Sequence, residues 1–164
     1  PLNAALSVAT ALYCGCPLSN IKERLKYIDL PERRLAISNS LSGSMLIDDS
    51  YNSNPASLKN AVDSLEGLER KKICILGDMK ELGSDSQKIH QEMYEYISER
   101  VDQIFCIGDE WSTCSPNEKQ DLYIFENQDD LYSHLISIID KKTILLVKGS
   151  RSTRMDLLAD KLKE

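Results

Sequence analysis

The chain has 164 residues, a length that suits one domain with a buried core and a short piece of another. Its formal net charge is -6, from 26 acidic and 20 basic residues. An acidic chain without a basic stripe argues against a nucleic-acid surface, and no apolar run approaches the roughly 20 residues that a membrane span needs. We therefore expect a soluble, cytoplasmic protein.

The five cysteines are odd in number and form no C-x-x-C pair. Cys74 and Cys106 lie in apolar, strand-like runs, where reduced cysteine packs as a small hydrophobic residue. We expect reduced, structural cysteines and no metal site.

The chain opens with two expected helices, residues 3–14 and 18–28, and Pro31 ends this helical lead. We interpret residues 1–31 as a separate segment and residues 32–164 as a domain. Because the chain starts with a proline and runs directly into a helix, we expect it to be part of a longer protein.

After the lead, two short runs are expected to pair as a hairpin across a turn-rich link, whose length leaves the register open. Further strands then alternate with helices. The expected hairpin strands are 35–38 and 45–49, the later strands are 72–77, 103–108, 122–125 and 143–148, and the helices are 55–68, 85–100, 128–139 and 151–163. Such alternation needs crossover connections. The fold class is therefore predicted as α/β, with a mostly parallel, Rossmann-like sheet and helices on both faces.

A polar loop, residues 48–54, follows the apolar run 45–47 and precedes a helix. Asn54 is the expected N-cap, and Pro55 suits the first helical position. At the carboxyl end of a strand and the amino end of a helix, free N–H groups favour phosphate or carboxylate. We expect this loop to bind a ligand.

Two other loops should lie at the same edge of the sheet. Residues 77–83 have glycines at both ends and three charges between them, and in residues 147–154 a strand ends on Lys148. There we expect Ser150 to cap a helix with Arg151 and Arg154 in its first turn. Cations oppose the helix dipole at that position, so the pattern indicates a bound anion.

In these three loops the chain resembles the Mur ligase family, and within it the members that use D-alanyl-D-alanine. Residues 48–55 resemble the motif D-D-S-Y-N-A-N-P, residues 76–83 resemble L-G-D-M-x-E-L-G, and residues 148–154 resemble K-G-S-R-S-x-x. The opening, residues 3–6, is similar to the end of the family's central ATPase domain. Residues 31–35 are similar to its P-G-R-L interdomain joint.

The resemblance implies the third domain of a cytoplasmic, ATP-dependent ligase of peptidoglycan biosynthesis, with residues 1–31 as the helical tail of the central domain. In the family reaction the carboxylate of UDP-muramoyl-tripeptide attacks ATP, and the amine of D-alanyl-D-alanine captures the resulting acyl phosphate. The phosphate loop, the Mg²⁺ ligands and the UDP-sugar domain belong to the missing N-terminal and central domains. We therefore expect no catalytic residue in this chain and no turnover by it alone.

The resemblance also implies two sets of binding residues. The nucleotide-binding residues are Asn3, Arg34, Asp49, Tyr51 and Asn52. The substrate-binding residues are Asn54, Asp78, Lys80, Lys148, Ser150, Arg151 and Arg154. In the second set, cations suit the carboxylate of the dipeptide and an acid suits its amine. Because Glu32 and Arg33 depart from the motif's spacing, Arg33 is an alternative to Arg34 on the nucleotide side.

Other interpretations stay open at this point. Asp48 and Asp49 can be a capping cluster, and residues 77–83 a solvated turn. His90 and His134 are expected to be surface or internally satisfied histidines. Two rival functions are a related amide ligase acting on folate or another cell-wall amino acid, and a stand-alone nucleotide- or anion-binding regulatory module. A phosphate loop upstream of this chain distinguishes a ligase from such a module.

Overall fold

A computed structural model describes residues 2–27, 32–118 and 121–164. The chain divides into two compact units, Pro1–Pro31 and Glu32–Glu164. The first unit contains the two helices expected there, α1 (Leu2–Tyr13) and α2 (Leu18–Leu25), which run in opposite directions. Its apolar side chains are mostly exposed; Tyr13, for example, is 93% accessible.

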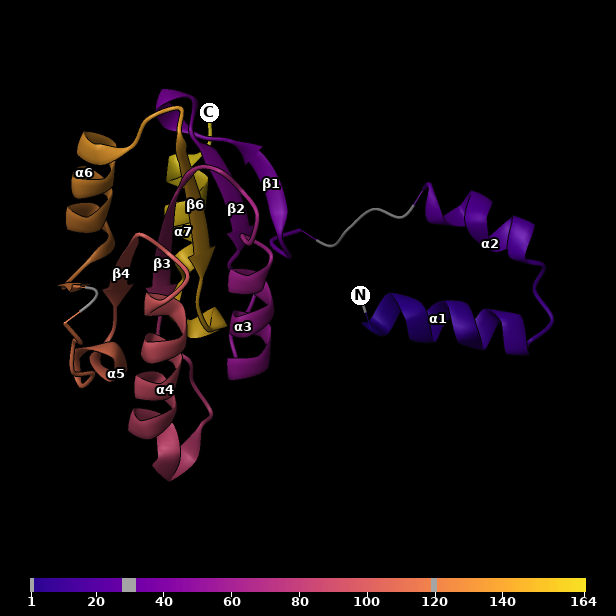
Figure 1. The fold of residues 1–164 in the computed structure, drawn as a ribbon, viewed down its shortest axis with the longest axis horizontal. Coiled ribbons are helices and arrows are strands. Elements are labelled where there is room, and N and C mark those ends of the chain that lie inside the picture. The colour runs from indigo at the N-terminus through magenta and orange to yellow at the C-terminus, as the bar shows by residue number, and fades with distance from the viewer. Residues whose placement is uncertain (1, 28–31, 119–120) are drawn as a thin grey trace. The chain divides into compact units, whose positions relative to one another are not determined.

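The second unit contains a six-stranded sheet in the order β1-β2-β6-β3-β4-β5 (Figure 1). The strands are β1 (Ala36–Asn39), β2 (Met45–Asp49), β3 (Lys71–Gly77), β4 (Gln103–Ile107), β5 (Leu122–Phe125) and β6 (Thr143–Lys148). Among the strands of this sheet, β1 and β2 pair antiparallel, with Ala36 opposite Asp48, and the pairings β2–β6, β6–β3, β3–β4 and β4–β5 are parallel. The predicted mostly parallel sheet with an initial hairpin is confirmed.

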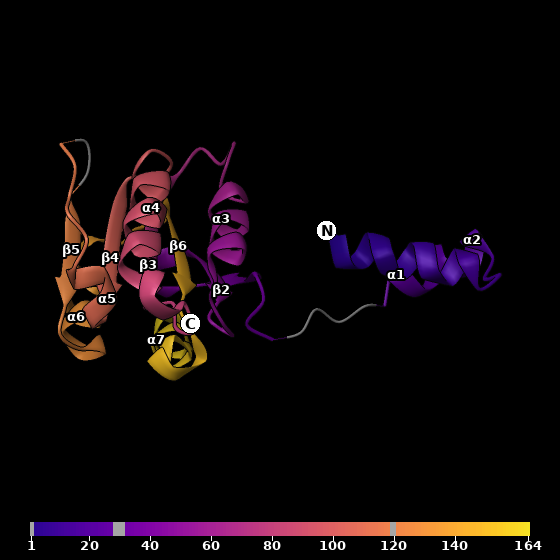
Figure 2. The ribbon, with the colours of Figure 1, turned by 90° about the horizontal axis from the view of Figure 1, so that it is seen from below.

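Helices cover both faces of this sheet (Figures 1 and 2). The helices are α3 (Pro55–Asp63), α4 (Ser86–Ser98), α5 (Asp109–Ser112), α6 (Gln128–Ile138) and α7 (Met155–Leu162). Because successive strand residues point to opposite faces, Leu146 belongs to the core under α3 and α4, whereas Leu145 belongs to the core under α6 and α7. None of the helices in the described ranges is long and apolar enough to cross a membrane.

Helix α3 is shorter than expected, because it ends at Asp63 rather than at residue 68. The hydroxyl of Ser64 donates to the carbonyl oxygen of Ala61 at 2.6 Å, which competes with further helical bonding. Gly67 then adopts a left-handed φ of 76° and turns the chain toward β3.

Candidate functional site at the carboxyl edge of the sheet

The three polar loops converge at the carboxyl ends of β2, β6 and β3, which are neighbours in the sheet. Ser150 lies where they meet. Its N–H donates to the carbonyl oxygen of Asp78 at 3.0 Å, and its Oγ accepts from the N–H of Lys80 at 2.8 Å and lies 3.4 Å from the carbonyl oxygen of Ser53. The predicted convergence of these loops is therefore present in the structure.

Asp48 is a buried structural residue. Its Oδ1 accepts from the N–H and the hydroxyl of Ser50, at 3.1 and 2.6 Å. Its Oδ2 accepts from Nζ of Lys163 at 3.0 Å. These contacts tie the start of the β2–α3 loop to the C-terminal end of the chain.

Asn54 caps α3, as the sequence predicts. Its Oδ1 accepts from the N–H of Ser57 at 2.8 Å, the hydroxyl of Ser57 accepts from the N–H of Asn54 at 3.1 Å, and Pro55 is the first helical residue. This reciprocal pair satisfies two backbone donors. The loop therefore enters the helix in a defined direction.

A cleft of about 270 Å³, here called the Asp49 cleft, opens on one side of this loop. Its lining residues are Arg34, Leu35, Asp49, Tyr51, Asn52, Asn54, Ser57 and Lys148. Lys148 is buried, and its Nζ donates to Asp49 and to the carbonyl oxygen of Asn52, the latter at 2.9 Å. Arg34 lies over the ring of Tyr51, at 4.4 Å from its centroid. Four predicted nucleotide-side residues thus share one cleft, and Lys148 lies with them rather than with the substrate set.

Arg33 and Arg34 point to different parts of the molecule. Arg33 donates to Asp160 on α7 at 2.8 Å, and this hydrogen bond raises the pKa of its guanidinium. Its φ of 60° is in the left-handed region that favours glycine. This conformation favours placing Arg33 at the glycine of the P-G-R-L pattern and Arg34 at its arginine.

A second cleft of about 640 Å³, the Arg151 cleft, opens on the other side of residues 52–54. Its lining residues are Asn52, Ser53, Asn54, Lys80, Glu81, Leu82, Ser150, Arg151, Ser152 and Arg154. Lys80 donates to Asp78 at 2.8 Å, and this hydrogen bond raises the pKa of the lysine. Arg154 lies 3.2 Å from Asp156. Within the described part of the chain, Arg151 forms no ion pair, so its charge is available to an anion.

The helix predicted to begin at Ser150 begins instead at Met155. Residues Arg151–Thr153 form a 3₁₀ turn, Ser150 makes no side-chain capping bond, and Arg154 adopts a left-handed φ of 51°. The expectation that two arginines oppose the dipole of this helix in its first turn is wrong. Both precede the helix, in a loop that folds back on the strand ends.

Close packing of the 150–154 loop against two glycines at the strand ends explains its path. A Cβ atom on Gly149 would lie 2.6 Å from Oγ1 of Thr153, and one on Gly77 would lie 2.5 Å from the same atom. The Thr153 hydroxyl donates to the carbonyl oxygen of Ser150 at 2.6 Å. The two glycines therefore let the 150–154 loop lie directly against β3 and β6.

Asp78, which the resemblance places in the substrate set, is 2% exposed and lines neither cleft. Besides pairing with Lys80, it accepts from the N–H of Trp111 at 3.3 Å. A Cβ atom on Gly108 would lie 2.2 Å from its carboxylate. Asp78 therefore acts within this structure by holding Lys80 beside the Arg151 cleft.

Both histidines lie away from the clefts. His90 is buried; its Nε2 accepts from the N–H of Met79 at 3.1 Å, and its Nδ1 lies 2.8 Å from the carbonyl oxygen of Ser86. His134 packs beside the ring of Phe105. The prediction of internally satisfied or surface histidines is confirmed. Asn3 belongs to α1, but its side chain lies outside the described residues.

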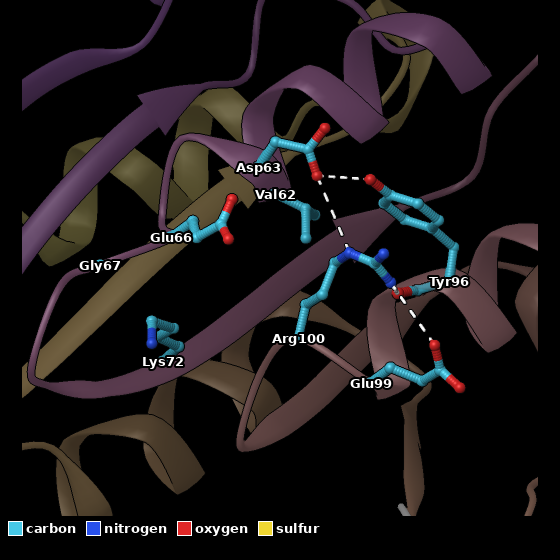
Figure 3. Close-up of a pocket in the computed structure, with 8 residues that line it drawn as sticks. All are labelled: Val62, Asp63, Glu66, Gly67, Lys72, Tyr96, Glu99 and Arg100. Carbon is cyan, nitrogen blue, oxygen red and sulfur yellow. Dashed lines mark hydrogen bonds and ion pairs between the residues drawn. The ribbon is translucent and has the colours of Figure 1, made fainter.

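A third hollow, of about 550 Å³, lies at the opposite edge of the sheet, near the start of β3 (Figure 3). Here Tyr96 donates to Asp63, and Arg100 lies 3.7 Å from the centroid of the Tyr96 ring and 3.9 Å from Asp63. Asp63 and Arg100 neutralise each other's charge, and none of the predicted binding residues lines this hollow. Across the ranges that the structure describes, no group of three or more His, Cys, Asp or Glu could hold a metal ion.

Comparison with known families gives a match over residues 33–151 to the Mur ligase, glutamate ligase domain. UDP-N-acetylmuramoyl-tripeptide--D-alanyl-D-alanine ligase of Haemophilus influenzae is 32% identical over 99% of this chain. The enzyme of the same name from Buchnera aphidicola subsp. Acyrthosiphon pisum is 35% identical over 99% of this chain. The chain spans 36% of the length of each of these relatives.

Solved structures show the same fold. A MurF structure from Acinetobacter baumannii has a TM-score of 0.83 and 30% identity, covering 97% of this chain and 36% of that one. MurF ligase from Thermotoga maritima in complex with ADP has a TM-score of 0.85 at 23% identity, covering 98% of this chain and 36% of that one.

Proposed function

The chain belongs to the Mur ligase family, and we propose that it is the C-terminal part of an ATP-dependent ligase that adds D-alanyl-D-alanine to the UDP-muramoyl-tripeptide precursor of peptidoglycan. The observation that carries the proposal is the pair of adjoining clefts at one sheet edge. One has a strand-end carboxylate beside an arginine and a tyrosine, and the other has three cations. Relatives that span nearly the whole chain carry this activity in their names.

We assign the Asp49 cleft to the nucleotide. A carboxylate at a strand end suits ribose hydroxyls, and the guanidinium of Arg34 suits phosphate. A volume of about 270 Å³ is just below the range of ligand pockets, which starts at about 300 Å³, so the cleft takes only part of a nucleotide. The central domain holds the remainder together with Mg²⁺, and the assignment of Asn3 to adenine follows the resemblance.

We assign the Arg151 cleft to the dipeptide. Arg151, Arg154 and Lys80 supply cations for its carboxylate, with Arg151 the most available because Lys80 and Arg154 already contact Asp78 and Asp156. Glu81, which the sequence does not mark as a binding residue, lines the same cleft, and its carboxylate can accept from the amine of the dipeptide.

In this proposal ATP supplies the phosphoryl group that activates the tripeptide carboxylate as an acyl phosphate. This chain positions the dipeptide so that its amine reaches that carboxyl carbon, and it covers one side of the nucleotide. Residues 1–31 are the helical end of the central domain, and the whole protein acts in the cytoplasm. The contributions are orientation and charge, with no nucleophile or proton donor assigned to these residues.

The proposal is tested by measuring ADP release and coupled product in the full-length protein, with ATP, Mg²⁺, UDP-muramoyl-tripeptide and D-alanyl-D-alanine. We expect turnover only when all are present, and none from residues 1–164 alone. Replacing the dipeptide by glutamate or a folate distinguishes the related amide ligases. Turnover that does not depend on D-alanyl-D-alanine contradicts the proposal.

A further inference from the structure

Arg33 connects the segment before β1 to the C-terminal helix α7. Its Nη2 donates to Oδ2 of Asp160 at 2.8 Å, and its Nη1 donates to the carbonyl oxygen of Asp156 at 3.0 Å. The same Nη1 lies 4.0 Å from the buried carboxylate of Asp48. Arg33 thus has three acceptors around it although it lines neither cleft.

The backbone of this segment has an uncommon conformation. Arg33 and Leu35, on either side of Arg34, have φ values of 60° and 52°. For residues with a side chain, such a conformation is strained and persists only where surrounding contacts determine it. The carbonyl oxygen of Arg33 accepts from the N–H of Tyr51 at 3.2 Å, and the N–H of Leu35 donates to Asp49 at 3.1 Å. These bonds and the side chain of Arg33 supply the needed contacts.

Few interactions hold the side chain of Arg34 in the Asp49 cleft. It is exposed, its guanidinium lies 4.4 Å from the centroid of the Tyr51 ring, and among the described residues it forms no hydrogen bond or ion pair. An exposed cation–π contact stabilises less than the ordering of an arginine side chain costs in conformational entropy. The direction in which Arg34 leaves the backbone therefore decides whether it stays over the cleft.

We propose that Arg33 is a positioning residue, which through Asp160 and the carbonyl of Asp156 fixes the backbone that directs Arg34 into the Asp49 cleft. The inference rests on the proposed function in one respect, the assignment of this cleft to the nucleotide. Helix α7 contributes no residue to the cleft, yet it supports nucleotide affinity in this arrangement. Arg33 acts through Arg34 and touches no ligand.

The experiment uses the full-length protein and measures the Kd for ADP, the KM for ATP and the KM for D-alanyl-D-alanine. We expect Arg33→Ala to raise both nucleotide constants at least fivefold and to change the dipeptide KM less than twofold. Arg33→Lys keeps a donor for one acceptor and should recover part of the loss. The matched control is Lys161→Ala, which breaks another ion pair of α7, to Asp129 at 2.5 Å, and should leave all three constants unchanged.

A double-mutant cycle separates positioning from a general structural effect. In an Arg34→Ala background, Arg33→Ala should add less than a twofold loss in ADP affinity; a full additional loss overturns the inference. If Arg33→Ala does not fold, the Kd for ADP is measured in Asp160→Asn instead. We expect about a twofold loss of ADP affinity in this variant, and an unchanged affinity contradicts the inference. A wild-type protein that fails to bind ADP contradicts the proposed function instead, whereas equal ADP binding by wild type and Arg33→Ala contradicts only this inference.

Discussion

Asp49 and Lys148 are register partners at the last positions of the neighbouring strands β2 and β6, and their side chains form an ion pair with 13% and 2% exposure. Lys148 also donates to the carbonyl oxygen of Asn52 at 2.9 Å. The pair therefore sets the direction of Asp49 and the path of the following loop at the same time. Both consequences can be tested separately.

Lys148→Met should destabilise the domain by about 3–5 kcal/mol, because it leaves a mostly buried carboxylate without its partner. Urea denaturation followed by circular dichroism measures the change. The double variant Asp49→Asn/Lys148→Met should recover part of the loss, since no unpaired charge remains. A loss below about 1 kcal/mol in Lys148→Met shows that water reaches the pair and screens it.

Asp49→Asn in the full-length protein should raise the KM for ATP about tenfold, equivalent to about 1.4 kcal/mol, and change the dipeptide KM little. A charged hydrogen bond contributes about 1.5–3 kcal/mol, so the loss of one such bond to ribose is enough to explain a tenfold rise in the KM for ATP. Steady-state kinetics with ATP varied at saturating dipeptide measure it. An unchanged ATP dependence assigns Asp49 only to the support of Lys148.

The regular elements could be predicted because their signals are local. Apolar runs such as residues 144–147 and the helical spacing of Leu58, Ala61 and Val62 indicate which face is buried. The Asn54–Pro55 cap is likewise contained within a few residues. Convergence of three loops then follows from parallel strand order, since the carboxyl ends lie at one edge.

What could not be predicted depends on contacts between distant residues. Arg154 adopts a left-handed φ, which separates the 3₁₀ turn from α7. Because arginine does not favour this conformation, the sequence predicts a continuous helix from residue 151. Asp78 has the residue type of a ligand-binding acid, but Gly108 brings the α5 segment over it and buries it. Lys148 is assigned to the dipeptide set by its motif and its charge, because its contact with Asp49, 99 residues away in the chain, leaves no local signal in the sequence.

The Arg33–Asp160 contact predicts a pH dependence of stability. The hydrogen bond from Arg33 lowers the pKa of Asp160 below its ordinary 3.8. A folded-state pKa below the unfolded value contributes stability above that unfolded value, and this is lost as the pH falls through the folded pKa. Asp160→Asn should therefore be less stable than wild type at neutral pH, and the difference should shrink below about pH 4. Arg33→Gln should show the same pattern; parallel acid-unfolding curves for all three proteins contradict it.

Burial should make three of the five thiols unreactive. It raises the pKa of Cys74 to about 12 and that of Cys114 to about 11, and it raises the pKa of Cys106 well above its usual range. Cys14 and Cys16 are exposed in the chain. At pH 8, Ellman's reagent should modify two thiols of residues 1–164 rapidly and the other three only after denaturant is added. Rapid modification of a third thiol contradicts the packing of β3 against β4 and α5.

The Arg151 cleft provides the sharpest test of the dipeptide site, since its three cations differ in what already binds them. Lys80 and Arg154 contact Asp78 and Asp156, whereas Arg151 has no acidic partner in the described ranges. In the full-length protein, Arg151→Ala should therefore weaken D-alanyl-D-alanine use at least tenfold, about 1.4 kcal/mol, and Arg154→Ala should do less. Kinetics with varied dipeptide at saturating ATP measure this. If Arg151→Ala lowers thermal stability and leaves the dipeptide dependence unchanged, the residue supports the loop and the dipeptide carboxylate binds elsewhere.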